Sequence, residues 1–269
     1  MNKRPHILIT NDDGVHAPGI KHLWNALKPV ADLTVVAPAF EQSCVGLSTT
    51  LRMPLRLEKI VTWNNGEEAI WSVDGTPADC IKIALHAVLK SKPDLVVSGI
   101  NRGGNMGQSA LYSGTVAATI ESAIQNIPAI AFSCNDFKLQ PNYELAAQHT
   151  PHFVEYVLAH PLPNGTILNV NFPGQELGDY KGIKMTTQGK DWWGEEPDRR
   201  EHPEEGHYYW LGGKLRVCDA EEENDGIWLR RGYITAVPIH VKDLTDHKHL
   251  ACSREHFENH FTTLKTIRF

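Results

Sequence analysis

Short apolar runs and amphipathic stretches alternate along the first part of the chain. Residues His6–Thr10 form a continuous apolar and β-branched run, which is typical of a strand buried on both faces. Pro18 then precedes apolar positions at helical spacing, namely Ile20, Leu23, Trp24 and Leu27. A second buried run follows at residues 33–37, so the pattern predicts a first βαβ unit.

The same alternation continues to about residue 170. Helical spacing of apolar positions predicts helices over residues 79–89, 115–125 and 144–158, and apolar runs predict strands at 95–97, 129–132 and 167–170. Strands that alternate with helices through short links favour an α/β fold with three layers, αβα. Its sheet is expected to be mostly parallel, Rossmann-like and covered on both faces. Ligands bind such a sheet at the carboxyl ends of its strands.

The pattern changes after about Pro173. Glycine, tryptophan, glutamate and histidine become frequent, and predicted strands at 183–187, 208–211 and 233–237 have no strong helical pattern between them. We therefore expect a C-terminal antiparallel β extension or arm. Because no charge-rich or Pro/Ser linker precedes it, the prediction is a single domain over residues 1–269 with a β-rich elaboration over about 174–269.

A segment from about Thr186 to Gly213 carries large aromatic residues at both ends of a polar stretch. The rings are Trp192, Trp193, Tyr208, Tyr209 and Trp210, and the polar stretch runs from Glu195 to Gly206. Two strands of a projecting arm would fit this pattern, and a long arm cannot bury large rings against itself. A partner subunit would then cover them, which predicts a homo-oligomer. In the alternative, the rings pack back on the parent sheet beside Pro173 and the polar stretch is a loop.

Composition and charge narrow the class of protein. A chain of 269 residues with 41% hydrophobic and 22% charged residues can bury a substantial core, which excludes the disordered and collagen-like classes. The formal net charge of -6 provides no positive field for a long polyanion, so we expect no nucleic acid duplex as partner. A small phosphate ester needs only local positive charge.

Cysteine usage and the N-terminus favour the cytoplasm. The five cysteines lie far apart and include no Cys-x-x-Cys pair, so neither a zinc knuckle nor a disulfide framework is indicated. The first apolar run stops at Asn11, which is too short for a signal peptide, and no later run could span a bilayer. The expectation is a cytoplasmic protein with no membrane partner.

The first chemical motif is Asn11-Asp12-Asp13-Gly14, which follows the first predicted strand. Two adjacent carboxylates repel each other, and at the mouth of a parallel sheet a cation is the main way to neutralise them. In the alternative, Asp12 or Asp13 caps the next helix and Gly14 permits the turn.

A glycine-rich loop forms the second motif. Residues 98–107 read Ser-Gly-Ile-Asn-Arg-Gly-Gly-Asn-Met-Gly, and Tyr112-Ser113-Gly114-Thr115 then opens a helix. Glycines let the backbone approach a ligand closely, and Ser113 and Thr115 supply donors at a helix N-terminus, where an anion is favoured. The pattern is neither a P-loop nor a dinucleotide fingerprint. The simpler interpretation is an ordinary glycine-rich loop with a serine cap.

Ser43 lies in a third loop, just past the second predicted strand and so at the same edge of the sheet. It could serve as a neutral oxygen ligand. A loop serine that bonds its own backbone is the alternative.

Taken in order, these motifs resemble the SurE family of stationary-phase survival 5′/3′-nucleotidases. The residues that carry the resemblance are Asn11-Asp12-Asp13-Gly14, Ala37-Pro38 with Gln42-Ser43, Val73-Asp74-Gly75-Thr76-Pro77, Ser98-Gly99-Ile100-Asn101 with Gly104-Asn105, and Tyr112-Ser113-Gly114-Thr115-Val116. A weaker match continues to Gly232-Tyr233 and Pro238.

The resemblance implies a complete site. Asp12, Asp13, Ser43 and Asn101 match the family's ligands to one divalent metal ion, and the two aspartates are the catalytic candidates. The substrate-binding candidates match its phosphate-contacting surface: Asn105, Ser113, Gly114 and Thr115. All four proposed ligands offer oxygen, which suits magnesium or manganese.

The implied activity is the hydrolysis of nucleoside 5′-monophosphates, and of 3′-monophosphates, to nucleoside and phosphate. Water or an aspartate could be the nucleophile. The alternative function is a metal-dependent nucleotide-binding sensor without turnover. Family members exchange extended hairpins, which implies a homodimer or homotetramer.

A few residues depart from the family pattern or allow both a functional and a structural interpretation. Cys44 stands where family members usually have glycine, and Asp136 could be a site residue or, more simply, a turn former. His240 could donate a proton near the active edge, although a surface position is the simpler interpretation. His256 and His260 have metal-ligand spacing on a helix, but a solvated tail helix without metal explains them better.

Overall fold

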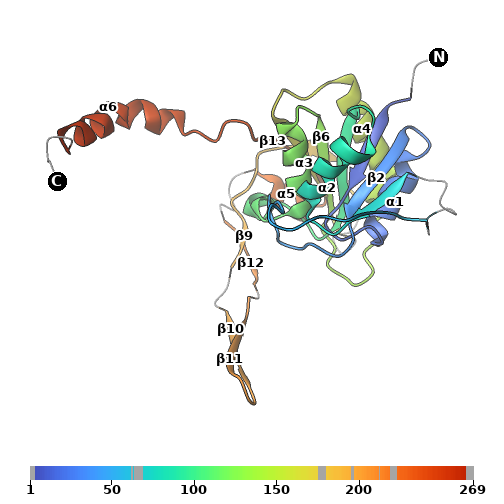
Figure 1. Cartoon of the computed structure of the whole chain (residues 1–269), viewed down its shortest axis with the longest axis horizontal. Coiled ribbons are helices and arrows are strands. Elements are labelled where there is room, and N and C mark those ends of the chain that lie inside the picture. The colour runs from blue at the N-terminus through green and yellow to red at the C-terminus, as the bar shows by residue number, and fades with distance from the viewer. Residues whose placement is uncertain are drawn as a thin grey trace.

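The computed structural model describes residues 4–61, 63, 69–174, 180–194, 197–211, 213–218 and 223–264. A central sheet with helices on both faces carries two projections, which extend from the body in different directions (Figure 1). One is a two-stranded arm. The other is the last helix, α6 (His247–Leu264).

Nine strands of the described chain form the central sheet, in the order β3, β4, β2, β1, β5, β6, β7, β13 and β8. Neighbours from β4 to β7 are parallel, which confirms the predicted sheet. These strands are β1 (His6–Thr10), β2 (Asp32–Pro38), β4 (Ile70–Val73), β5 (Leu95–Arg102), β6 (Ala129–Cys134) and β7 (Thr166–Phe172). The short β3 (Leu57–Lys59) pairs antiparallel with β4 at the edge. Most positions of β1, β5, β6 and β7 are buried, as expected for strands covered on both faces.

Alternate side chains of the strands enter two separate cores. Ile7 and Ile9 of β1 pack with residues of α1 (Pro18–Leu27) and α4 (Glu144–Ala159), whereas Leu8 packs on the other face with α2 (Pro77–Ile83) and α3 (Gly114–Ile124). The three-layer αβα architecture is therefore confirmed.

The helix predicted over residues 79–89 begins and ends differently in the structure. Thr76 caps α2 by a reciprocal pair of hydrogen bonds with Asp79, so the helix begins at Pro77. It then continues into the π-helical turn η2 (Ala84–Val88).

The C-terminal extension differs in detail from the predicted antiparallel arrangement. β13 (Ile234–His240) does pair antiparallel with β7, but β8 (Ile183–Met185) pairs parallel with β13. Parallel neighbours need a long crossover connection, and here the arm and the short helix α5 (Asp225–Arg230) provide it. The sequence shows no strong helical pattern for α5, because it is only one and a half turns long.

The predicted arm is present. β9 (Trp192–Trp193) pairs antiparallel with β12 (Leu215–Arg216) near the body, and β10 (Asp198–His202) pairs with β11 (Gly206–Trp210) further out. Every residue of β10 and β11 is exposed, so the alternative in which Tyr208, Tyr209 and Trp210 pack back on the parent sheet is wrong. Residues 195, 196 and 212 of this segment lie outside the described residues.

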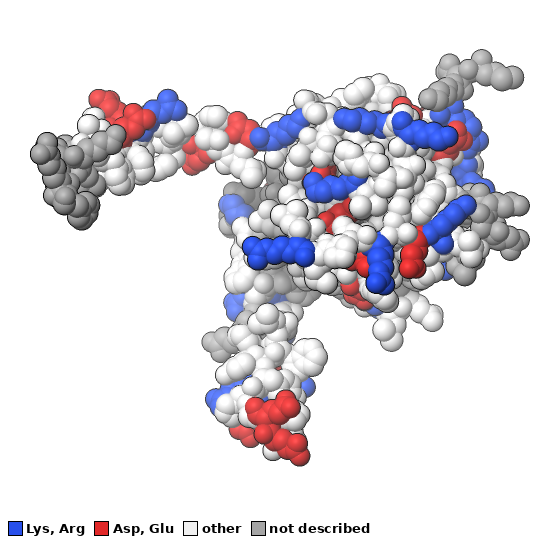
Figure 2. Space-filling view, in the orientation of Figure 1, with Lys and Arg blue, Asp and Glu red and all other residues white. Residues whose placement is uncertain are grey.

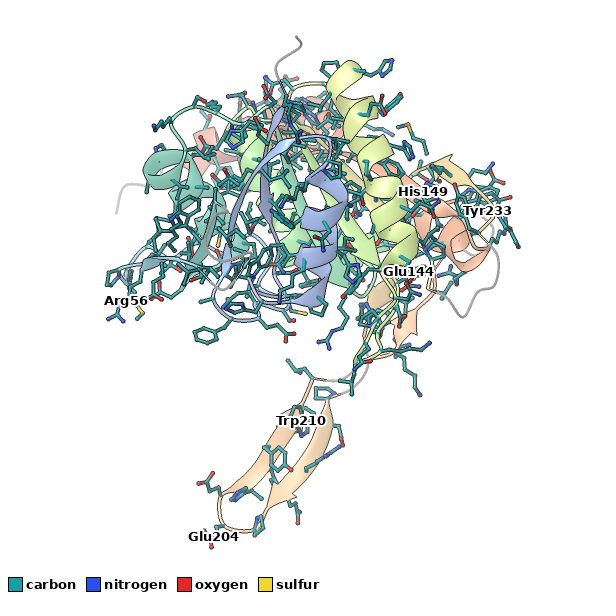
Figure 3. All side chains as sticks on the ribbon, turned by 90° about the vertical axis from the view of Figure 1, so that its right-hand side faces the viewer. Arg56, Glu144, His149, Glu204, Trp210 and Tyr233 are labelled. Atoms are coloured by element: carbon teal, nitrogen blue, oxygen red, sulfur yellow. The ribbon has the colours of Figure 1, made fainter. Side chains whose placement is uncertain are left out.

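The outer hairpin of the arm lies apart from the body and carries acidic side chains at its tip (Figure 2, Figure 3). Glu204 and Trp210 lie on the hairpin well away from the body, which carries Glu144 and His149 (Figure 3). Acidic side chains gather at the hairpin tip, and basic side chains are scattered over the visible face of the body (Figure 2). Among the described helices, none is long and apolar enough to cross a membrane.

Candidate functional site

Loops from three strands meet at the carboxyl edge of the parallel sheet. Thr10, the last residue of β1, lies opposite Ser98 of β5, so the segments that follow these two residues begin side by side. The backbone N–H of Gln42 donates to the carbonyl of Asp12 at 2.7 Å, which ties the loop after β2 to the same place. The edge predicted from the strand pattern is therefore the place where the candidate residues converge.

Asp12 and Asp13 are held by the two neighbouring loops. The Thr115 hydroxyl donates a short hydrogen bond to Oδ1 of Asp12, and the backbone N–H of Arg102 donates to Oδ2 of Asp13 at 3.0 Å. Neither aspartate caps the next helix, because the N-cap of α1 is Ala17 and has no side-chain cap. The capping alternative for this motif is therefore wrong.

Burial raises the pKa of both carboxyl groups, because it disfavours their charged forms. Burial raises the pKa of Asp12, and the hydrogen bond from Thr115 opposes that rise. Burial and, after it, the charge of Asp12 raise the pKa of Asp13 to about 7, and the nearby Arg102 offsets only part of this effect. A pair of this kind is suited to a cation, which would favour the charged form of both groups.

The start of α3 lies directly against Asp12. A Cβ at Gly114 would lie 2.8 Å from the Cβ of Asp12, so only glycine lets the helix begin this close to the carboxylate. Ser113 is the N-cap and accepts a hydrogen bond from the backbone N–H of Val116 at 3.1 Å, as the simpler interpretation of this motif expected. The next N–H groups of the first turn, those of Gly114 and Thr115, hydrogen-bond the Asp12 carboxylate and oppose the rise of its pKa.

Asn105 is held by polar side chains that the sequence motifs do not include. Its backbone N–H donates to Oδ1 of Asn171 at 2.7 Å, and its carbonyl accepts from Nδ2 of Asn169 at 2.8 Å. Its own amide Nδ2 donates to the Ser133 hydroxyl at 2.8 Å. Asn169 and Asn171 face the same side of β7, and two asparagines at alternate positions of an apolar strand were the signal that could have found them.

Asn101 and Ser43 make local hydrogen bonds. The amide Nδ2 of Asn101 donates to the carbonyl of Gly103 at 2.8 Å, so its Oδ1 is not engaged in that bond. Ser43 is exposed, and its hydroxyl donates to Oε1 of Glu41 at 2.6 Å. Glu41 in turn lies 3.7 Å from Arg102, which follows Asn101. The structure brings Asp12, Asp13 and Asn101 to one edge and links Ser43 to it through Glu41.

Cys44 adopts the backbone conformation that favours glycine. Its φ angle is 58°, in the left-handed region. This explains why glycine would suit the position, and the loop accommodates cysteine because the side chain is exposed.

The donor set fits a hard divalent cation. It consists of two carboxylates, an amide oxygen and a hydroxyl, which are the oxygen ligands that magnesium and manganese prefer. Over the described residues, no cluster of three or more histidine, cysteine or acidic side chains is placed to hold a metal, so no competing site of that kind is present there. His256 and His260 lie on α6 at exposed positions, as expected of a helix whose surface is solvated.

Two other residues follow the simpler interpretations. The carboxylate of Asp136 accepts hydrogen bonds from the backbone N–H groups of Lys138 and Asn142, at 3.1 and 3.3 Å, and so shapes a turn. His240 is exposed and pairs with Thr166 at the beginning of β7, which is the end of the sheet away from Asp12. His240 is therefore not placed to give a proton at the active edge.

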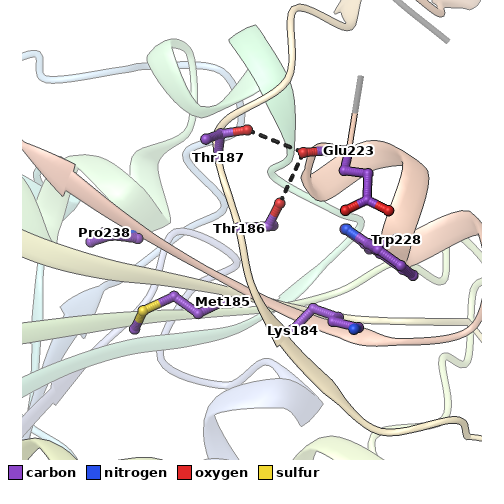
Figure 4. A pocket seen from close by; sticks show the side chains of 7 residues that line it. All are labelled: Lys184, Met185, Thr186, Thr187, Glu223, Trp228 and Pro238. Carbon is purple, nitrogen blue, oxygen red and sulfur yellow. Dashed lines mark hydrogen bonds between the residues drawn. The ribbon is translucent and has the colours of Figure 1, made fainter. Parts of the chain in front are cut away.

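A separate pocket of about 430 Å³ lies at the β8 edge of the sheet (Figure 4). The hydroxyls of Thr186 and Thr187 both donate to the carbonyl of Glu223 there, at 3.3 Å each, and the Lys184 ammonium lies over the ring of Trp228. Its lining contains none of the predicted site residues. The candidate site is therefore the edge around Asp12.

Comparison with known proteins identifies the family. The family model described as "Survival protein SurE" matches residues 7–195, which is more than half of the chain. This chain belongs to the SurE family. The match contains all of the predicted site residues, in keeping with the motif resemblance.

SurE relatives cover almost the whole chain. A protein named 5′-nucleotidase SurE from Protochlamydia amoebophila is 52% identical over 259 residues, which cover 96% of this chain and 98% of that protein. Another of the same name, from Thermosipho melanesiensis, is 42% identical and covers 94% of this chain and 98% of its own. The crystal structure of the SurE protein from Aquifex aeolicus has a TM-score of 0.79 at 39% identity, covering 92% of this chain and 98% of that one. The SurE fold is thus shared over the body of the molecule.

Proposed function

We propose that this chain is a metal-dependent phosphomonoesterase that hydrolyses nucleoside 5′-monophosphates, and also 3′-monophosphates, to nucleoside and phosphate. The observation that carries the proposal is an adjacent pair of carboxylates, of which the buried Asp12 contacts the N-terminus of α3. Relatives named 5′-nucleotidase SurE, similar over nearly the full chain, support the nucleotide as substrate.

The cation and the phosphate would occupy adjacent parts of the site. Asp12, Asp13, Ser43 and Asn101 would hold one Mg²⁺ or Mn²⁺. When bound, the ion supplies positive charge for the phosphoryl oxygens and lowers the pKa of water. For Ser43 to take part, its hydroxyl would have to leave Glu41, which requires only a side-chain rotation at an exposed position.

The start of α3 would bind the phosphoryl group. The helix dipole favours an anion at this first turn, whose N–H groups of Gly114 and Thr115 also hydrogen-bond the Asp12 carboxylate. Ser113 and Thr115 add hydroxyl groups, and Asn105 adds an amide fixed by buried partners. Donors that are already oriented stabilise developing charge without reorganisation.

Two nucleophiles are compatible with this arrangement. Water could attack phosphorus, or Asp12 could attack it and form an aspartyl-phosphate. The hydrogen bond from Thr115 to Asp12 lowers the nucleophilicity of that carboxylate, which favours water. Rapid-quench trapping with ³²P-labelled substrate separates the two, because only the second leaves label on the protein.

The function is tested by release of inorganic phosphate. The purified chain is stripped of metal with EDTA and then given Mg²⁺ or Mn²⁺ and each nucleoside 5′- or 3′-monophosphate. We expect metal-dependent phosphate release from the 5′-monophosphates, and from the 3′-monophosphates as well. Metal-dependent nucleotide binding without phosphate release would contradict the enzyme and support the sensor.

His240→Ala provides a matched control for this assay. His240 is an exposed histidine at the opposite end of the sheet from Asp12. We expect its removal to leave turnover unchanged, whereas a loss of turnover would show that the proton donor lies outside the site proposed here.

A further inference from the structure

Two exposed aromatic rings meet beside the metal-ligand loop. Phe137, in the loop after β6, and Trp193, in β9 of the arm, lie edge to face, with their ring centroids 5.7 Å apart and an angle of 73° between the ring planes. Their side chains come from segments far apart in sequence. The pair is used by none of the chemistry described above.

Phe137 lies against Gly103, which directly follows β5, the strand that carries Asn101 near its end. A Cβ at Gly103 would lie 2.6 Å from Cε1 of Phe137, so the ring covers the backbone of Gly103 directly. Gly103 also has a φ angle of 102°, and its carbonyl accepts the hydrogen bond from the amide of Asn101. Phe137 therefore contacts Gly103, which in turn is hydrogen-bonded to Asn101, a proposed metal ligand. Asn105 lies two residues after Gly103 in the sequence.

Trp193 is held in place by the base of the arm. β9 pairs with β12 and packs against η3 (Gly107–Leu111), the turn between the glycine-rich loop and Ser113. Within the same strand, Trp192 points to the other face, where the guanidinium of Arg216 lies 5.8 Å from its ring centroid. The two tryptophans are almost equally exposed, at 42% for Trp192 and 45% for Trp193, yet only Trp193 contacts Phe137.

The exposed rings of Phe137 and Trp193 provide a surface on which a planar ligand can stack. Phe137 is 58% exposed although it packs on Gly103, and an edge-to-face pair leaves ring faces open. Aromatic side chains stack on nucleobases of any kind, because every base has a π-face. A nucleoside monophosphate carries its base one sugar away from the phosphate, so a base could reach the rim of a site whose phosphate lies at Asn105 and α3.

We propose that Phe137 and Trp193 form the nucleobase subsite of this protein. The inference rests on the proposed function and adds the residues that distinguish a nucleotide from a simple sugar phosphate. Stacking does not depend on the hydrogen-bonding groups of the base, so the subsite accepts purines and pyrimidines. It favours purines because their rings are larger. It strengthens substrate binding without touching the reacting atoms.

The test compares two substrates that differ only in the base. Kinetics are measured with Mn²⁺ on AMP and on ribose 5-phosphate, for the wild type and for Phe137→Ala, Trp193→Ala and Trp192→Ala. We expect Phe137→Ala and Trp193→Ala each to lower the ratio of kcat/KM for AMP over ribose 5-phosphate by about tenfold, mainly through KM. Trp192→Ala should leave this ratio unchanged, and Phe137→Tyr should restore it.

Two results would overturn the subsite. One is a ratio that is unchanged in both Phe137→Ala and Trp193→Ala. The other is an equal loss for both substrates together with a lower oligomeric mass by light scattering, which would make the pair a contact between copies of the chain.

A binding measurement separates this inference from the proposed function. AMP and ribose 5-phosphate are titrated into EDTA-treated protein by calorimetry. If neither compound is hydrolysed in the kinetic assay with Mn²⁺, yet AMP binds the EDTA-treated wild type more tightly than ribose 5-phosphate and does not do so in Phe137→Ala, the subsite stands and the proposed function fails. Equal affinity for the two compounds in the wild type would overturn the subsite whether or not phosphate is released.

Discussion

At the scale of single residues, the ionisation of Asp13 links the site to the stability of the chain. Its ordinary pKa of 3.8 is raised to about 7 by burial and by the charge of Asp12. Between these two pH values the unfolded chain has lost the proton and the folded, metal-free chain keeps it. The free energy of unfolding of the metal-free protein therefore falls as the pH rises from about 4 to about 7, and the penalty is constant above that.

Asp13→Asn removes this penalty. We expect the metal-free variant to resist urea better than the metal-free wild type at about pH 8, with the difference shrinking as the pH falls toward about 5. Saturating Mn²⁺ should reverse the order, because only the wild type retains all four of the proposed ligands. A urea midpoint difference that does not change with pH would contradict the raised pKa of Asp13.

Thr115→Ala tests the contact between α3 and Asp12. The variant loses a buried hydrogen bond to Asp12 and one proposed donor to the phosphate, so kcat/KM should fall by roughly fivefold to 100-fold. Thr115→Ser keeps the hydroxyl and should retain most activity. Thr119→Ala, which removes an equally buried hydroxyl one turn further along α3, should leave the kinetics unchanged. Unchanged kinetics in Thr115→Ala would remove this residue from the site.

The sequence predicted those residues that lie at or directly after the carboxyl ends of strands. Asp12, Asp13 and Asn101 could be found in this way, because the carboxyl ends of parallel strands share one edge. Asn169 and Asn171 lie within β7 and act on Asn105 from another strand, so only the three-dimensional pairing relates them to it. The contact between Phe137 and Trp193 could not be predicted from the sequence for the same reason, because it joins a loop to the arm.

At the scale of elements, the root of the arm is fastened to the loop that leads to Ser113. The backbone N–H of Gln108 donates to the carbonyl of Asp191 at 2.8 Å, and the N–H of Gly107 donates to Oδ2 of Asp225 at 3.0 Å. The buried carboxylate of Asp191 also pairs with Arg230 at 2.7 Å. A deletion that removes Asp191 would therefore disturb the site as well as the arm.

We propose that the outer hairpin joins copies of this chain into a homodimer or homotetramer. Its exposed aromatic residues, Tyr208, Tyr209 and Trp210, are large rings that lack a partner surface within the arm. Replacing residues 198–210 with a short Gly-Ser bridge removes β10 and β11 and retains Asp191. We expect the variant to have a lower mass by light scattering than the wild type.

Two controls make the hairpin experiment decisive. Glu204→Lys changes the charge of the exposed hairpin tip and leaves the rings in place, so it should keep the mass of the wild type. If the variant without the hairpin kept the oligomeric mass of the wild type, the arm would not be an interface between copies of the chain. A wild type that is monomeric at micromolar concentration would refute the oligomer itself.

The elements that the sequence predicted well are those with a periodic apolar pattern. α1, α3 and α4 begin and end close to the predicted positions, because each buries one face against the sheet. The parallel pairing of β8 was not predictable from its own residues. It depends on the crossover through the arm and α5, which a local pattern does not encode.

At the scale of the whole molecule, the sequence predicts the fold of the body, which has a hydrophobic core, better than it predicts the two projections. Strands and helices from β1 to β7 bury two continuous apolar layers, and the sequence signals both. The outer hairpin of the arm (β10 and β11) and α6 project from this body with mostly exposed side chains, so burial does not restrict the direction in which they extend (Figure 1). The sequence of these two segments predicts strands and a helix, but it does not predict their position relative to the body.

The central claim is that Asp12 and Asp13 hold the ion that drives phosphate release from a nucleotide. The most direct measurement is kcat/KM for AMP in Asp12→Asn and Asp13→Asn at saturating Mn²⁺, with Asp94→Asn, an exposed aspartate at the other end of β5, as control. Each site variant keeps the side-chain volume and loses one charge, so turnover should fall on the order of 100-fold or more, while Asp94→Asn behaves as the wild type. Near-native turnover in either site variant, with its fold intact by circular dichroism, would contradict the account.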